Sequence, residues 1–241
     1  MIKRTPYFNV AIKLALMASL FSGSYNSKAQ DFKDALLKMK SAYGNAERIH
    51  IMMSIQAFEK ESSSKPFYIQ KVEIKKDHKN FLYELGNRDM LLNATYLIMT
   101  DHTTKQIFFN KPDSSAATGL QDPFKVNIDS LLTAYGKSSY MGTTNELEYY
   151  KIIHAKGMVK QTDMYFLVQT KLLQKIEYHY RANQRVTIDF KVFDKEPQFA
   201  ADTFDEAKYI AWLDGKPRAG QSYLGYRVIN AKESTKVIDN N

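Results

Sequence analysis

Residues 48–58 alternate apolar and other side chains with a period of two, and this pattern constrains the fold more than any other feature. One set of alternate positions carries Ile49, Ile51, Met53, Ile55 and Ala57, and the other carries His50, Met52, Ser54, Gln56 and Phe58. Because successive side chains of a β-strand point to opposite faces, the alternation predicts a strand with one apolar face. Such a strand needs neighbouring strands and a cover for that face.

Segments of similar character follow in two runs, and short polar connections separate the members of each run. The first run comprises residues 68–75, 80–85, 90–93, 96–100 and 107–110, and the second comprises 148–154, 164–169, 173–181 and 185–193. A short connection joins antiparallel neighbours, whereas a parallel pair needs a long crossover. The pattern therefore predicts one large, curved antiparallel sheet, since a parallel α/β sheet would alternate strands with helices.

Two segments have the spacing of amphipathic helices. In residues 31–43 an apolar stripe follows Asp31 and consists of Phe32, Leu36, Met39 and Tyr43. A second stripe occupies residues 128–135, while 204–212 are predicted as a short helix or turn and 137–145 as a loop. The expected fold class is thus α+β, with a few helices against one face of the sheet.

The N-terminus has the layout of a secretory signal peptide. Lys3 and Arg4 precede the largely apolar residues 10–21, and Ser27 and Ala29 place small side chains at positions −3 and −1 of a cleavage point. We predict cleavage after Ala29 and export of the chain; an uncleaved N-terminal anchor is the alternative.

The remaining residues, 30–241, fit a single domain, and no linker rich in Pro, Gly and Ser divides them. Within it, residues 213–241 are predicted as a loosely ordered tail with a last strand near 223–230. The chain has no Cys, so neither disulfides nor thiol chemistry are available.

Charge and motifs exclude several classes of function. The net charge is +8, but four of the cations lie in the predicted signal peptide and the others are interspersed with Asp and Glu, so no nucleic-acid partner is expected. The sequence lacks the hydrolase elbow, the phosphate-binding loop, the dinucleotide fingerprint and the H-E-x-x-H zinc motif. Glu177 and His179 share a strand face and could both bind a metal, but we favour a polar surface stripe. We therefore expect no catalytic residue, no metal, no cofactor and no enzymatic activity.

The strands at 96–100 and 107–110 are apolar on both faces, which a sheet with one wet face does not require. Helices could cover both faces, a partner protein could cover one, or the sheet could curve around an apolar cavity that holds a lipid. Between these strands, we expect Asp101 and His102 to be hairpin-turn residues, with Asp101 bonding the turn backbone.

Four parts of the chain together resemble the LolA-like family of periplasmic lipoprotein carriers. These are the exported start with its amphipathic helix and following strand, "VEIKKDHKNFLYE" at 72–84, "YLIMTDHTTKQIFFN" at 96–110 and "LLQKIEYHYRANQRVTIDF" at 172–190, with the Phe-containing stretch 199–204 beyond. The resemblance covers about residues 31–210. It departs from the family at 76–83, which lack the usual Pro, Gly and Arg, and at His102, where the family commonly has Gly.

The resemblance implies an unclosed antiparallel β half-barrel with a few helices packed as a lid on its concave face. It implies a monomeric periplasmic carrier for lipid or lipoprotein acyl chains, with inner- and outer-membrane lipoprotein-sorting proteins as partners. An envelope stress sensor or protein-interaction module on the same fold is the alternative. From the doubly apolar strands we place the cavity wall at Met53, Ile55, Val72, Ile74, Phe81, Tyr83, Leu97, Met99 and Phe109, and the lid contacts at Leu36, Leu37, Leu131 and Leu132.

Overall fold

The computed structural model describes residues 25–112 and 137–231. Helix α2 (Tyr25–Gly44) is the first element of the described residues. The first run of strands is β1 (Arg48–Phe58), β2 (Tyr68–Asp77), β3 (Asn80–Leu85), β4 (Arg88–Leu92), β5 (Leu97–Asp101) and β6 (Gln106–Asn110). The second is β7 (Lys137–Thr144), β8 (Leu147–Ile153), β9 (Val159–Leu167), β10 (Leu173–Tyr180) and β11 (Arg185–Asp194). The described residues end with η1 (Glu206–Lys208), β12 (Ile210–Leu213), β13 (Lys216–Ala219), η2 (Gln221–Tyr223) and β14 (Arg227–Asn230).

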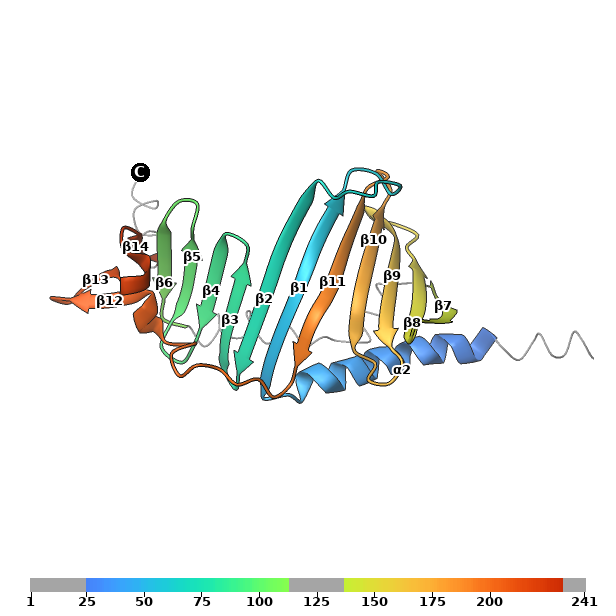
Figure 1. The fold of residues 1–241 in the computed structure, drawn as a ribbon, viewed down its shortest axis with the longest axis horizontal. Coiled ribbons are helices and arrows are strands. Elements are labelled where there is room, and N and C mark those ends of the chain that lie inside the picture. The colour runs from blue at the N-terminus through green and yellow to red at the C-terminus, as the bar shows by residue number, and fades with distance from the viewer. Residues whose placement is uncertain (1–24, 113–136, 232–241) are drawn as a thin grey trace, which may run out of the picture.

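Twelve strands form one open sheet in the order β14-β6-β5-β4-β3-β2-β1-β11-β10-β9-β8-β7 (Figure 1). All neighbours are antiparallel except β14, which runs parallel to β6. The alternating strand β1 lies at the centre, where it pairs with β2 on one side and β11 on the other. The predicted large, unclosed antiparallel sheet is therefore confirmed, and the small hairpin β12–β13 lies outside it.

The described residues contain one part of the predicted helical lid. Among the described residues α2 is the single α-helix, and the helix predicted at 128–135 lies outside them. Residues 204–212, predicted as a short helix or turn, hold the 3₁₀ helix η1 and then the start of strand β12. Residues 137–145, predicted as a loop, form the edge strand β7, because pairing with β8 stabilises a segment whose own sequence has little strand preference.

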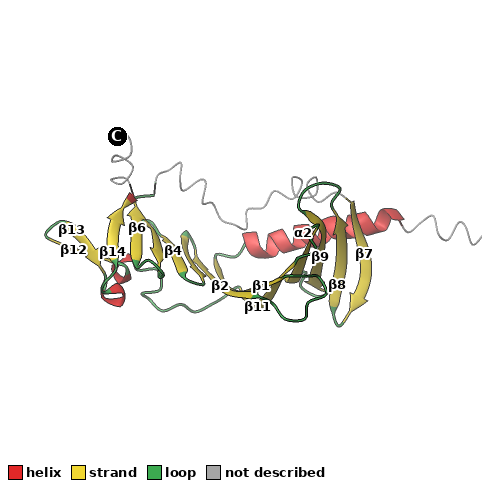
Figure 2. Cartoon of the chain, turned by 90° about the horizontal axis from the view of Figure 1, so that it is seen from above, coloured by secondary structure: helices red, strands yellow, loops and turns green. Residues whose placement is uncertain are grey.

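The concave face of the sheet carries the side chains that share a face with Ile51. Ile51 lies opposite Ile74 of β2, and both pack in one buried cluster with Tyr43 of α2. Figure 2 shows α2 against this concave face towards β7. There the helix buries Phe32 and Leu36 in a cluster with Tyr150, Ile152, Met164, Phe166, Leu173 and Ile176. The apolar stripe of the helix thus covers one half of the concave face.

The convex face is apolar at the opposite half of the sheet. Here the C-terminal segment, residues 204–228, packs on strands β3–β6. Its Tyr209 and Ile210 are buried in a cluster with Leu82, Leu91, Ile98, Ile107 and Phe109. Asn93 fixes the segment further, because its amide donates to the Phe204 carbonyl at 3.1 Å. Strands β5 and β6 are apolar on their convex side because this segment covers them.

Candidate functional site

The C-terminal segment covers one apolar face of strands β4–β6, and the other face carries the half-exposed Met99. On the concave face Met90, Met99 and Phe108 lie side by side in cross-strand register, and Leu92 lies beside Leu97. We call these five residues the concave patch. Met99 is 49% exposed, whereas its neighbour Ile98, which points to the convex face, is 0% exposed. The other patch residues are partly buried.

Strand register connects the concave patch to the surface beneath α2. Met90 lies opposite Tyr83 of β3, and Tyr83 lies opposite Ile74 of β2. Tyr83 packs against the same cluster that contains Tyr43 of the helix. The apolar side chains therefore continue across the sheet from the filled space under α2 to the accessible strands β4–β6.

The concave patch is an apolar surface, and none of its five side chains is ionisable. Its two methionines have flexible, polarisable side chains that adapt to irregular apolar partners. The edge of the patch is polar, where Arg88 Nε lies 3.2 Å from Asp101 Oδ2. Such a surface can bind hydrocarbon, but it cannot perform acid–base or nucleophilic chemistry.

Asp101 ends strand β5 and His102 begins the turn that leads to β6, close to the predicted positions. Asp101 Oδ1 accepts hydrogen bonds from the backbone amides of Thr103 and Thr104, at 2.9 and 3.0 Å. These amides, the Thr104 amide foremost, and the Arg88 side chain lower the pKa of the Asp101 carboxyl. The expected turn-forming role of Asp101 is confirmed.

The side chain of His102 also contacts Asp89 and Tyr226, which the sequence did not indicate. Its Nε2 lies 2.8 Å from Asp89 Oδ2, and its Nδ1 lies 3.0 Å from the Tyr226 hydroxyl. Tyr223 also donates to Asp89 Oδ2, at 3.3 Å. His102 therefore ties the β5–β6 hairpin to the C-terminal segment, which is a structural role for the Asp-His pattern of the sequence.

The predicted wall residues divide between the two faces. Strand register places Met53, Ile55, Val72, Ile74, Phe81, Tyr83, Leu97 and Met99 on the concave face. Phe109 is on the convex face, buried at 5% exposure in the cluster with Tyr209, so its assignment to the wall was wrong by one residue. Phe108 takes its place, because a shift of one residue along a strand exchanges the faces.

The predicted lid contacts also divide. Leu36 is fully buried against the sheet, but Leu37 is 43% exposed and points away from the buried cluster. Leu131 and Leu132 lie outside the described residues. Under α2 the space is filled by side chains: the Phe32 and Tyr150 ring centroids are 5.3 Å apart. The accessible part of the concave apolar face that holds Met99 lies beyond this helix, on β4–β6.

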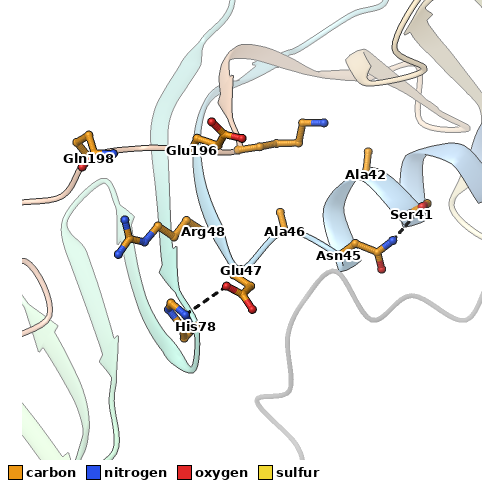
Figure 3. Close-up of a pocket in the computed structure, with 10 residues that line it drawn as sticks. Ser41, Ala42, Asn45, Ala46, Glu47, Arg48, His78, Glu196 and Gln198 are labelled. Carbon is orange, nitrogen blue, oxygen red and sulfur yellow. Dashed lines mark hydrogen bonds and ion pairs between the residues drawn. The ribbon is translucent and has the colours of Figure 1, made fainter.

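A hollow of about 730 Å³ lies where α2 ends and β1 begins (Figure 3). Its lining is mostly polar and comprises Ser41, Ala42, Asn45, Ala46, Glu47, Arg48, His78, Lys195, Glu196 and Gln198. His78 Nε2 lies 3.4 Å from Glu47 Oε2 within it. This lining suits water and ions, so the hollow is not the apolar cavity that the sequence predicted.

On the convex face, strands β9 and β10 bring together Asp163, Glu177 and His179. Their potential metal-ligand atoms lie within 4.8 Å of one another. Each carboxylate already accepts hydrogen bonds: Asp163 from Tyr149, and Glu177 from Lys175 at 2.8 Å.

A divalent cation at this cluster would have to replace the positive charges already paired with the carboxylates. Burial on its own would raise the pKa of Glu177, but the charges and hydrogen bonds of Lys175, with Arg185 and His179, lower it. The cluster therefore acts as a compensated polar network. Sequence spacing identified Glu177 with His179, and only the pairing of β9 with β10 adds Asp163.

No protein-family model matches the sequence, and a search of curated proteins found no match. Among solved structures, an uncharacterized conserved protein from Thermus thermophilus is similar with a TM-score of 0.47 and 6% identity, over 83% of this chain and 99% of that chain. A LolA superfamily protein from Nitrosomonas europaea is similar with a TM-score of 0.30 and 8% identity, over 73% and 97%. The Pseudomonas aeruginosa MucA/MucB complex has a chain with a TM-score of 0.38 and 12% identity, over 78% and 63%.

The sequence resemblance named the LolA-like family, and a LolA superfamily structure is among those to which this chain is similar. Since these TM-scores lie below 0.5, function is inferred from the side chains of this chain. None of the helices in the described residues has the length and hydropathy of a membrane span.

Proposed function

We propose that the protein is a monomeric periplasmic carrier that binds acyl chains of lipids or lipoproteins on its concave face. The observation that supports this function most is the half-exposed Met99 in a row of apolar side chains, on strands whose other face is already buried. Soluble proteins seldom leave a contiguous apolar surface open unless it binds something.

Energetics favour a hydrocarbon ligand on the concave patch. Each methylene removed from water contributes about 0.8 kcal/mol, so burying about six of them contributes about 5 kcal/mol before ordering costs. The patch presents side chains and no unpaired backbone group, because β4, β5 and β6 bond each other along the ladder. A hydrocarbon chain would therefore leave no polar group of the sheet unsatisfied.

Export is part of the proposal. It rests on the predicted signal peptide with cleavage after Ala29, a position inside helix α2, which begins at Tyr25. Membrane-bound lipoprotein-sorting proteins are the proposed partners for loading and release, as the sequence resemblance implies.

A protein-interaction or stress-sensing module is the second candidate. Three consecutive apolar residues where β2 begins support it, since Phe67, Tyr68 and Ile69 are 61%, 48% and 59% exposed. Such a row could pack against a partner chain. It would act without any acyl chain on the concave patch, so the two candidates separate by experiment.

The test is titration of the purified, delipidated protein with a fluorescent long-chain fatty acid. Met99→Asp places a carboxylate in the concave patch, and we expect at least about tenfold weaker binding, because a charge beside hydrocarbon is poorly solvated. Met141→Asp is the matched control, since Met141 is 50% exposed on the edge strand β7 and should leave binding unchanged.

Equal affinity of wild type and Met99→Asp would refute binding at the concave patch. A folded wild-type protein that binds no fatty acid would refute the carrier and favour the interaction module.

A further inference from the structure

The hairpin β12–β13 projects past the β14–β6 end of the sheet (Figure 1). Leu213 pairs with Lys216 across its turn. Asp214 and Gly215 form that turn with φ values of 52° and 73°, the left-handed pair of a tight hairpin with a type I′ turn. The base is fixed because Ile210 is 3% exposed in the convex cluster. A rigid support thus holds the tip in solvent.

The tip presents large apolar side chains to water. Trp212 is 52% exposed and Leu213 is 60% exposed. The Trp212 ring meets buried Phe109 edge-on, with centroids 6.0 Å apart, which orients the indole without covering it. Indole combines an apolar body with a polar N–H, and this combination favours the boundary between hydrocarbon and water.

The charge around the tip is positive. Lys216 and Arg218 are exposed on β13, and neither forms an ion pair with a carboxylate of residues 25–112 or 137–231. Asp214 is the one acidic residue between Ile210 and Arg227. Exposed cations beside an apolar tip complement a surface that combines negative charge with hydrocarbon.

We propose that the β12–β13 hairpin docks the protein on an anionic phospholipid bilayer. Trp212 and Leu213 enter the interface, and Lys216 and Arg218 lie at the lipid phosphates. A bilayer fits better than a protein partner, because a specific protein interface buries about 800 Å² on each side and a short hairpin tip cannot supply that area. Docking needs no ligand on the concave patch, so the inference goes beyond the proposed carrier function.

Trp212 makes the test direct, because it is the single Trp of the chain. The purified protein is titrated with vesicles of phosphatidylcholine containing phosphatidylglycerol, and with vesicles of phosphatidylcholine alone. We expect a blue shift of Trp emission with the anionic vesicles, quenching by brominated acyl chains, and weaker binding at high salt.

Variants of the tip separate its charge from its apolar side chains. Each cation near an anionic bilayer strengthens binding about fivefold, so the double variant Lys216→Gln and Arg218→Gln should bind about 25-fold more weakly. Asp214→Asn should bind more tightly, because it removes the anion and Asn-Gly keeps the turn. Leu213→Asp should lose binding. Met158→Asp, an 80% exposed position in the β8–β9 loop, is the matched control and should bind like wild type.

Unchanged Trp emission with the anionic vesicles would overturn the proposal, and so would wild-type affinity in the Lys216→Gln, Arg218→Gln variant. Failure of the carrier proposal looks different. Met99→Asp should dock on vesicles like wild type while losing fatty-acid binding, and the tip variants should bind fatty acid normally.

Discussion

Neighbouring residues Ile98 and Met99 in β5 provide a direct test of how the two faces of the sheet differ. Ile98 is 0% exposed beneath the C-terminal segment, whereas Met99 is 49% exposed on the concave patch. Truncating each residue to Ala changes opposite faces of the same strand at almost the same place. The two variants should therefore differ in stability if only the convex face is covered.

The expected magnitudes follow from these exposures. Ile98→Ala removes three carbon atoms from a filled cluster, which costs about 2.4 kcal/mol in transfer and about 3 kcal/mol with the cavity that remains. Met99→Ala removes a side chain that is already half in water, so its cost is about 1 kcal/mol or less. The difference in the free energy of unfolding between the variants is thus about 2 kcal/mol.

Urea unfolding followed by circular dichroism measures this difference. With a dependence on urea of about 2 kcal/mol per molar, Ile98→Ala lowers the midpoint by about 1.5 M, and Met99→Ala lowers it by about 0.5 M or less. The slope should not change, because both variants keep the same fold. Equal losses in the two variants would show that the concave patch is as well covered as the convex cluster, and the reasoning would fail.

Two further predictions concern the polar network and the helix. Since Lys175 and its neighbours lower the pKa of Glu177 below its ordinary value of 4.5, its carboxylate contributes stability that is present above pH 4.5 and lost as pH falls through the lowered value. Glu177→Gln should therefore unfold at a lower urea concentration than wild type at neutral pH. The difference between the two urea midpoints should narrow when they are measured at successively lower pH. A difference that stays constant with pH would contradict this prediction. In α2, Leu36→Ala should cost about 2–5 kcal/mol and Leu37→Ala under about 0.5 kcal/mol, and similar losses in thermal unfolding would contradict the observed helix orientation.

Local periodicity predicted most of the strands. The alternation in residues 48–58 coincides with β1, because a strand with one face on a core requires that pattern. Strand β7 was missed because Lys137–Thr144 is polar and contains Gly142, and its pairing with β8 stabilises it instead. Tyr140 contributes through packing, with its ring centroid 5.4 Å from that of Tyr150. Nothing in the local sequence signals this partner.

The sequence predicted that the candidate site is an apolar surface, but it predicted only some of the residues that form this surface. The doubly apolar strands showed that each face of β5 and β6 needed a partner. They did not show which face the C-terminal segment covers, and so Phe109 was assigned to the site where Phe108 belongs. Which face of the sheet a residue of β6 lies on depends on the register of every strand pair between β6 and β1. Residues distant in sequence set that register.

By itself the sequence determined most of the strands, the antiparallel pairing of consecutive strands, the amphipathic helix at residues 31–43 and the turn role of Asp101, because periodicity and turn chemistry act over a few residues. Tertiary structure alone decided that α2 covers one half of the concave face and the C-terminal segment the opposite half of the convex face. It also decided that Asp163 joins Glu177 and His179, and that Trp212 stands on an exposed tip. These features depend on which distant segments bury which surface, and the burial of apolar area is the main free-energy contribution that favours one arrangement over another.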